Sequence, residues 1–246
     1  DIHAGGEDLI FPHHENEIAQ SEAANGKEFS RYWMHNGFLN IDNRKMSKSL
    51  GNFFTVREIS EKYDLQVLRF FMLSAHYRSP LNFSAELMEA AKSGLERIIT
   101  AADRLKFLMG SAKTEDMAET EAEKFAKSAE YVGNFESAMD DDFNTADAIA
   151  AVFDLVKFIN TMTDEDSSKE YLENLFDRLV RLTEVLGIIV DKEDEILDSD
   201  IEALIAERQA ARKEKNFARA DEIRDELLAK GIVLKDTREG VQWKRA

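Results

Sequence analysis

The sequence predicts a mixed, mostly α-helical fold, and three observations support that prediction. Residues 1–40 combine short strand-like runs with one helix, which is typical of an α/β segment. From Ser84 onward, apolar residues recur about every 3.6 positions, the spacing of helices that pack one face against a core. Residues 201–246 end the chain with two amphipathic helices and a hairpin pattern, which indicates a small α+β domain.

Composition sets the general class of the protein. The chain has 246 residues and is 43% apolar, which is enough to bury a sizeable core. It holds no run of about eighteen apolar residues and no secretion or lipidation signal, so we expect a cytoplasmic protein with no membrane attachment. Cysteine is absent, so a metal site built from these residues alone uses histidine and carboxylate ligands. Because Asp1 opens directly on a strand-like run, we interpret the chain as a fragment of a longer polypeptide.

The net charge of −17 is unevenly distributed along the chain. Residues 201–246 carry eleven Lys and Arg against nine Asp and Glu, a net of +2, which leaves 21 against 40, or −19, for residues 1–200. Phosphate affinity comes from clustered Lys and Arg. We therefore expect only the carboxy-terminal segment to meet a polyanion without a local redistribution of charge.

The amino-terminal elements follow from local signals. A helix is expected to begin near Pro12, because proline lacks the N–H that the first turn of a helix cannot use. Residues 38–41 form a strand-like run, and residues 44–52 form a polar loop. A helix signal at Thr55 and the apolar helical run 67–73 follow.

The central elements predict an up-and-down helical bundle. The first helix begins at Ser84, and its apolar face is predicted to consist of Leu87, Ala91, Leu95, Ile98, Ala102 and Leu105. Three further amphipathic stretches are expected at 122–139, 145–163 and 168–186. Acidic residues 191–200 are typical of a linker. Helices at 201–215 and 218–230 and a glycine-bearing hairpin over 232–243 complete the chain.

The string Lys45-Met46-Ser47-Lys48-Ser49 is the first constellation with chemical meaning. Two lysines and two hydroxyls within five residues offer cationic and hydrogen-bonding donors to a polyphosphate, whose developing charge needs positioned positive groups. The alternative is an ordinary exposed polar loop.

A second constellation is the run Phe11-Pro12-His13-His14-Glu15-Asn16-Glu17 at the expected helix start. Residues four apart share a helix face, so His13 and Glu17 project together as an imidazole and a carboxylate suited to one Zn²⁺. His14 shares another face with Ile18, which excludes the zinc-protease pattern His-Glu-x-x-His. Two ligands do not close a tetrahedral site, so a metal reading requires partners from outside the chain. The alternative is a surface contact between the two side chains.

The third constellation is Gly5-Gly6-Glu7-Asp8, between a strand and a helix. Glycines let the backbone approach a nucleotide, and the acid two residues later can accept hydrogen bonds from ribose hydroxyls. The pattern is not the dinucleotide-binding fingerprint, and a plain turn would explain it equally well.

Together these strings resemble one enzyme family. Lys45–Ser49 matches the second signature of class I aminoacyl-tRNA synthetases letter for letter. Residues 1–21 resemble the region of cysteinyl-tRNA synthetases that shortly precedes that loop. Residues 70–79 and 139–145 resemble further segments of this family, and residues 201–245 are similar to its small anticodon-binding domain. The resemblance covers essentially the whole chain.

The resemblance implies an order of domains. Residues 1–40 would be the carboxy-terminal part of a Rossmann-type class I synthetase catalytic domain, and 41–83 the KMSKS loop and stem-contact region. Residues 84–198 would be a DALR-like helical bundle, and 199–246 the small anticodon-binding domain. The amino-terminal part of the catalytic domain, with its His-Ile-Gly-His signature, would lie outside this chain.

The resemblance also implies a reaction. The family activates cysteine with ATP and Mg²⁺ and transfers the cysteinyl group to the 3′ end of tRNA(Cys). Its zinc ion binds the substrate thiolate and so discriminates against serine. His13 and Glu17 match two of the zinc ligands, and two cysteine ligands would lie outside this chain. We therefore expect the fragment alone to be inactive.

Further site residues follow from the same resemblance. Lys48, assisted by Lys45, would stabilise the departing pyrophosphate as a catalytic and ATP-binding residue. Gly6 and Asp8 would lie on the ribose and adenine side of the ATP pocket. His3 would either approach the substrate amino acid or serve as a core histidine.

The carboxy-terminal residues are expected to contact RNA. Trp243, Lys244 and Arg245 would combine base stacking with phosphate contacts, although a tryptophan at a hairpin end is also a common core residue of small domains. Arg212 lies on a helix with a basic side. The implied partners are tRNA(Cys), ATP and cysteine, and the complete enzyme is expected to be a monomer.

Two alternatives remain at this point. One is a related ligase that joins activated cysteine to an amino sugar in thiol biosynthesis, which reads no RNA. Residues 201–245, with their likeness to an anticodon-binding domain, favour the synthetase. The other alternative is a tRNA-binding module without catalysis.

Overall fold

The computed structural model describes residues 1–42, 44–46, 54–190, 198–213, 216–230, 232–237 and 240–245. The chain forms two compact units, Asp1–Asp191 and Lys192–Ala246. Within the described ranges, no helix is both long enough and apolar enough to span a membrane.

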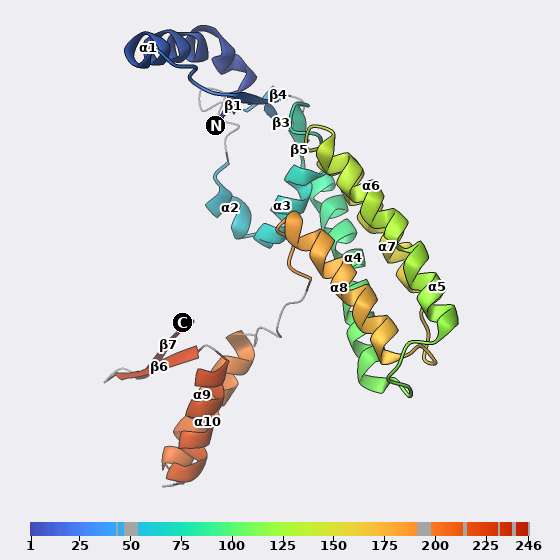
Figure 1. Cartoon of the computed structure of the whole chain (residues 1–246). Helices are drawn as coiled ribbons and strands as arrows, with labels where there is room; N and C mark the ends of the chain where they lie inside the picture. The colour runs from blue at the N-terminus through green and yellow to red at the C-terminus, as the bar shows by residue number, and fades with distance from the viewer. Residues whose placement is uncertain are drawn as a thin grey trace. The chain divides into compact units, whose positions relative to one another are not determined.

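The first unit begins with an α/β segment (Figure 1). Strand β1 (Ile2–Gly6) runs parallel to β2 (Tyr32–Asn36). Between them the chain passes through two short helical turns, η1 (Glu7–Leu9) and η2 (Ile10–His14), and through helix α1 (Glu15–Asn25). A helix that connects two parallel strands is the crossover unit of α/β folds, which agrees with the α/β segment predicted for residues 1–40. The strand at 32–36 was not predicted.

A second small sheet has the strand order β4–β3–β5. Strand β3 (Leu39–Ile41) pairs antiparallel with β4 (Arg44–Lys45) and parallel with β5 (Leu81–Phe83). Helices α2 (Val56–Ser60) and α3 (Leu65–Leu73) connect β4 to β5 in the chain. The strand pair β3–β5 therefore joins the amino-terminal segment to residues that lead directly into the helical bundle.

Side-chain caps start helices α2 and α3 where the sequence predicts helical signals. Thr55 accepts a hydrogen bond from the Glu58 N–H, and the Glu58 carboxylate accepts one from the Thr55 N–H at 2.7 Å, which is a capping box. Asp64 accepts from the Gln66 N–H at 2.7 Å at the start of α3. The buried residues of α3 that anchor it in the core are Val67, Phe70 and Phe71.

The bundle consists of α4 (Ala85–Ser111), α5 (Glu119–Lys127), α6 (Ala129–Asp140), α7 (Thr145–Met162) and α8 (Lys169–Val185). Helix α4 packs against α3, α7 and α8, and α6 packs along α7 (Figure 1). The largest fully buried side chains of this core are Met88, Ile98, Leu105, Leu155, Ile159, Tyr171, Leu172, Leu175, Leu179 and Ile188. This is the up-and-down arrangement that the sequence predicts.

Two details of the bundle differ from the sequence prediction. Leu87, expected on the apolar face of α4, is 42% exposed, and Met88 beside it is completely buried. The single stretch expected at 122–139 is two helices that meet at Ser128. The Ser128 hydroxyl donates to the Phe125 carbonyl at 2.8 Å and accepts from Arg178 of α8, and such local bonding competes with continuous helix.

The second unit is a helix pair followed by a hairpin. Helices α9 (Asp198–Lys213) and α10 (Phe217–Ala229) pack on each other, and β6 (Ile232–Thr237) pairs antiparallel with β7 (Gly240–Arg245). Its small buried core consists of Ile205, Ile223, Leu227 and Ile232. This is the α+β pattern that the sequence predicts.

Candidate functional site

The candidate site lies where β1, η2, α1 and β2 come together. His3 is on β1, His14 ends η2, and Glu17 lies in the first turn of α1. Trp33 and His35 belong to β2, and the register of the parallel pair places Trp33 opposite His3. The β–α–β crossover thus gathers side chains that are far apart in the sequence.

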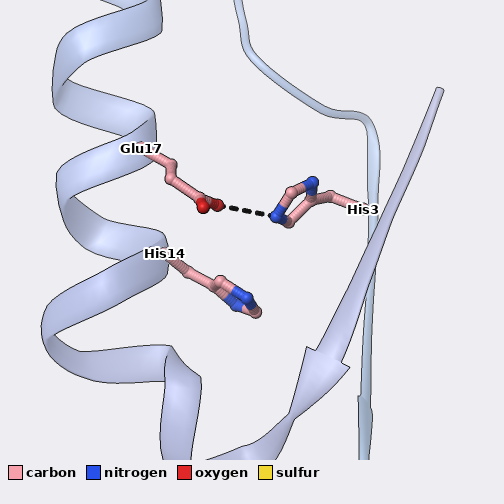
Figure 2. A group of neighbouring side chains, drawn as sticks. All are labelled: His3, His14 and Glu17. Atoms are coloured by element: carbon pink, nitrogen blue, oxygen red, sulfur yellow. Dashed lines mark ion pairs between the residues drawn. The ribbon is translucent and has the colours of Figure 1, made fainter.

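Three of these side chains form a group that could hold a metal ion (Figure 2). One ligand atom from each of His3, His14 and Glu17 lies within 4.8 Å of the other two. His3 Nε2 is 2.7 Å from Glu17 Oε2, and His14 is buried with 4% of its surface exposed. Two imidazoles and one carboxylate are a donor set that suits Zn²⁺.

Aromatic rings surround the two histidines. The Phe29 and Trp33 rings each lie 4.9 Å from the His3 ring, measured between centroids. On the other side, His14 Nδ1 is 2.8 Å from His35 Nε2. One of these two nitrogens donates and the other accepts, so the tautomers of the two rings are linked. The orientation of His14 is therefore set by β2.

His35 has an electrostatic environment that favours its neutral form. Burial lowers the pKa of His35, and the nearby charges of His14, Arg78 and His3 lower the pKa further. A neutral His35 keeps one ring nitrogen as an acceptor.

Of the two predicted metal ligands, one belongs to the group of three and the other lies outside it. Glu17 belongs to the group of three, as its predicted role requires. His13 is exposed and lies outside the group formed by the described residues, and its role as a ligand stays a prediction. The structure brings in His14, which precedes Glu17 by three residues and so also shares its helix face. In the sequence, the three-residue spacing from His14 to Glu17 could have indicated this pair. The prediction used the four-residue spacing from His13 to Glu17 instead.

The glycine turn explains how His14 reaches the strand. A Cβ atom added to Gly5 would lie 3.0 Å from both Cε1 and Nε2 of His14. A Cβ atom on Gly6 would lie 2.5 Å from Oδ1 of Asp8, which is itself an exposed side chain of η1. Gly5 therefore allows the imidazole to pack against the backbone, while contacts of Gly6 and Asp8 with ATP stay predictions.

The lysine loop is only partly within the described structure. The backbone of Lys45 lies in β4, where it pairs with Asn40, and the Met46 N–H donates to the Leu39 carbonyl at 3.2 Å. Lys48 lies outside the described residues. The sheet β4–β3–β5 thus supports the amino-terminal end of the predicted loop.

The predicted RNA-contacting residues lie in the second unit. Trp243, Lys244 and Arg245 belong to β7, where Trp243 pairs with Leu234 of β6. Their side chains lie outside the described part of the chain. Arg212 is exposed on α9. Binding of RNA by these residues stays a prediction.

Family models match three segments of the chain. Residues 1–93 match the class I (C) tRNA synthetase catalytic domain, 134–190 match the DALR domain, and 194–243 match the cysteinyl-tRNA ligase anticodon binding domain. Their order agrees with the architecture of the two units.

Relatives named cysteine--tRNA ligase align with the whole chain. The protein from Lachnospira eligens is 69% identical over 246 residues, which are all of this chain and 52% of that protein. The protein from Clostridioides difficile is 55% identical over 245 residues, all of this chain and 53% of that protein. The chain therefore spans about half the length of the curated relatives it matches.

Solved structures agree with this assignment at the level of the fold. The LeuRS of Agrobacterium radiobacter K84, in a ternary complex, matches with a TM-score of 0.61 and 18% identity over 79% of this chain and 28% of that one. A methionyl-tRNA synthetase from Mycobacterium tuberculosis matches with a TM-score of 0.52 and 18% identity over 76% of this chain and 40% of that one. With three family models in order and relatives aligned along its whole length, the chain belongs to the cysteinyl-tRNA synthetase family.

Proposed function

We propose that this chain works as part of a cytoplasmic, monomeric cysteine--tRNA ligase that activates cysteine with ATP and Mg²⁺ and transfers it to the 3′ end of tRNA(Cys). The observation that carries the proposal is the 69% identity to a cysteine--tRNA ligase along the whole chain. The group of His3, His14 and Glu17 beside the glycine turn supports it, because it offers metal ligands next to the predicted nucleotide pocket.

Zinc is the cofactor that fits the proposal. The described donor set of two imidazoles and a carboxylate suits this ion, and cysteine ligands would have to come from outside the chain. A bound zinc ion would supply a strong preference for a sulfur ligand, which separates cysteine from serine. Glu17 and His13 would hold it as the sequence predicts, and His14, which lies with Glu17 in the group of three, is the alternative imidazole ligand.

The residues of this chain would also organise ATP. Lys48 and Lys45 would place positive charge at the pyrophosphate that departs when the adenylate forms. Gly6 would allow close backbone approach, and the Asp8 carboxylate would accept from the ribose hydroxyls. These roles are electrostatic and geometric, so they would act on the transition state more than on cysteine affinity.

The function is tested in a polypeptide of the relatives' full length that contains this sequence. We expect cysteine to drive ATP–pyrophosphate exchange. Exchange with serine should be slower by roughly four orders of magnitude, because a site built to bind the thiolate strongly disfavours a substrate that lacks it. We also expect charging of a tRNA(Cys) transcript. Exchange with another amino acid and not with cysteine would overturn the proposal. Exchange with cysteine but no tRNA charging would favour the ligase that uses an amino sugar.

The ligand assignment has a separate test, which is the zinc content of the purified full-length protein. We expect Glu17→Gln to lose most of the metal. His13→Asn and His14→Asn are a matched pair of adjacent substitutions, and their zinc contents should differ. The variant that loses zinc identifies the imidazole ligand. Full zinc content in Glu17→Gln would remove the carboxylate from the site.

A further inference from the structure

Three consecutive residues between α3 and β5 gather around one carboxylate of the bundle. The Tyr77 hydroxyl donates to Asp142 Oδ1 at 2.7 Å, and Arg78 Nε donates to Asp142 Oδ2 at 2.5 Å. His76 Nε2 lies 3.9 Å from the same Oδ2, and its ring stacks on Tyr77. We call these four residues the clasp. Both oxygens of Asp142 are engaged by a segment about 65 residues earlier in the chain.

The clasp stabilises the ionised form of Asp142. The hydrogen bonds from Arg78 and then from Tyr77 lower the pKa of Asp142, and the same bond to Asp142 raises the pKa of Arg78. The Asp142 side chain is 42% exposed and that of Arg78 is 54% exposed, so water screens the attraction. The geometry of two directed hydrogen bonds therefore matters more than the strength of the ion pair.

Asp142 lies in a turn with an unusual backbone. Asp142 and Phe143 have φ angles of 55° and 56°, in the left-handed region that residues with a large side chain rarely adopt. The turn is closed by hydrogen bonds from the Phe143 N–H to Met139 and from the Asn144 N–H to Ala138, both 3.1 Å. Such conformations persist where the surrounding structure holds them and are concentrated at functional positions.

The loop that carries Tyr77 and Arg78 also contacts Gly37, the residue that follows β2 and precedes β3 in the chain. The Gly37 N–H donates to the Tyr77 carbonyl at 2.8 Å. A Cβ atom on Gly37 would lie 2.6 Å from the carbonyl carbon of Ser79 and 2.8 Å from the nitrogen of Pro80. The two backbones are therefore in direct contact, and the position of the loop that carries Tyr77 fixes that of Gly37.

Gly37 lies between β2, which borders the metal-binding group, and β3, which leads to the lysine loop. On one side is β2, with Trp33 and His35 beside the metal-binding group. On the other side is β3, which pairs with β4 at the start of the lysine loop. Thr145, in the first turn of α7, adds a further contact to the Ala75 carbonyl at 3.5 Å. A continuous series of contacts thus runs from the α6–α7 turn to the strands that bear the site.

We propose that Asp142 is a positioning residue, which holds Tyr77 and Arg78 and thereby fixes the strand connection at Gly37 in the geometry that the site requires. The expected effect of Asp142 on catalysis rests on the proposed function. The expected effect of Asp142 on the rigidity of the backbone at Gly37 does not. The two are therefore measured separately in the same full-length protein.

The mechanical test compares Asp142→Asn with Asp166→Asn by hydrogen–deuterium exchange. Asp166 is the control, because it is an exposed carboxylate of the same unit that also pairs with a cation, Lys113 at 2.8 Å, but lies outside the clasp. We expect Asp142→Asn to accelerate exchange of the Gly37 amide by roughly tenfold, since local opening becomes easier. Asp166→Asn should leave that amide unchanged. Equal protection of Gly37 in the two variants would overturn the proposal.

The catalytic test measures cysteine-dependent ATP–pyrophosphate exchange per folded enzyme. We expect Asp142→Asn to lower kcat by roughly tenfold, as small misplacements of catalytic groups do, with the KM for cysteine changed less than kcat. Tyr77→Phe removes a single hydroxyl from the clasp and should lower kcat in the same direction. The double variant should lose less than the sum of the two. Normal kcat in both single variants would overturn the role of the clasp.

Failure of the proposed function has a different signature. If the wild-type protein shows no exchange with cysteine, the proposed function is wrong, and protection of the Gly37 amide still decides the mechanical claim. If the wild type is active and Asp142→Asn behaves like Asp166→Asn in both measurements, the proposed function stands and the clasp has no positioning role.

Discussion

At the scale of single residues, Glu121 shows how one carboxylate can accept hydrogen bonds from donors at the starts of two helices. Its oxygens accept hydrogen bonds from the Ala118 N–H at 3.0 Å, the Ser168 N–H at 2.9 Å and the Ser168 hydroxyl at 2.7 Å. Ala118 precedes α5 and Ser168 precedes α8, so Glu121 satisfies donors at both helix starts. The side chain is buried, with 9% of its surface exposed, so water cannot replace these bonds.

We expect Glu121→Gln to reduce the free energy of unfolding by about 1–3 kcal/mol, because an amide leaves one buried donor unsatisfied. Burial raises the pKa of Glu121, but hydrogen bonds from Ser168 and Ala118 outweigh it, so the net pKa is lowered from 4.5. A lowered folded-state pKa stabilises the protein above the unfolded-state value, and this stabilisation is lost as pH falls through the folded-state value.

Urea denaturation at pH 7 and at about pH 4 measures both parts of this prediction, since the second value lies below the ordinary glutamate pKa. The difference between wild type and Glu121→Gln should be larger at pH 7. Glu123→Gln, an exposed position on the same helix, is the control and should match the wild type. A difference that does not change with pH would contradict the ionised state of Glu121.

The candidate site shows what residue spacing can predict. Glu17 and the glycine turn were identifiable from the sequence, because their chemistry depends on residue type and local order. The choice between His13 and His14 was not, because it depends on where the helix begins, and which of the two is a ligand stays a prediction. The structure begins α1 at Glu15 after a turn in which Phe11 has non-helical angles. His35 reaches His14 only through the pairing of β1 with β2, which the sequence alone does not specify.

At the scale of elements, helix starts with a side-chain cap were predictable, because capping is a local interaction. The start expected near Pro12 was wrong, since α1 begins at Glu15. Ser84 accepts from the Leu87 N–H, and Thr55 and Glu58 form a capping box, both within four residues. The break between α5 and α6 was not predicted. At this break the Ser128 hydroxyl bonds locally to the Phe125 carbonyl and also accepts from Arg178, fifty residues away. The second contact depends on how α8 packs, which a local pattern does not specify.

Two glycines give a matched prediction for this scale. Gly133 lies inside α6 with nothing within 4 Å of an added Cβ, so Gly133→Ala should stabilise the protein by about 0.5–1 kcal/mol. Gly37→Ala should destabilise it, because the methyl group would meet backbone atoms at 2.6–2.8 Å that cannot move as a side chain can. Thermal unfolding of the two variants should therefore shift the midpoint in opposite directions. A stabilising Gly37→Ala would contradict the backbone contact.

At the scale of the whole molecule, net charge differs along the chain: the carboxy-terminal segment 201–246 is slightly basic, and the rest of the chain is acidic. Residues 1–200 carry a net charge of −19, and residues 201–246 carry +2. The acidic surface disfavours indiscriminate binding of RNA, so contacts with phosphate are expected where basic side chains gather. Composition alone predicts this asymmetry, whereas the choice of individual contacts depends on the fold of each unit.

Arg212 on α9 and Arg181 on α8 test this asymmetry in the full-length protein. Arg212 is exposed in the second unit, and Arg181 lies in the bundle, 3.7 Å from Glu136. We expect Arg212→Ala to weaken binding of a labelled tRNA(Cys) transcript and to reduce the slope of log Kd against log salt by about 1, because one phosphate contact is lost. Fluorescence anisotropy over a series of salt concentrations measures both quantities.

Arg181→Ala removes the same charge from the acidic unit, so any general effect of net charge on RNA binding must appear in it as well. We expect it to leave the salt slope unchanged, since Arg181 lies in the acidic part of the chain, away from the predicted RNA-contacting segment. An equal loss of slope in the two variants would mean that RNA binding follows the total charge of the protein. A loss confined to Arg181→Ala would place the phosphate contact on the bundle and contradict the assignment to the second unit.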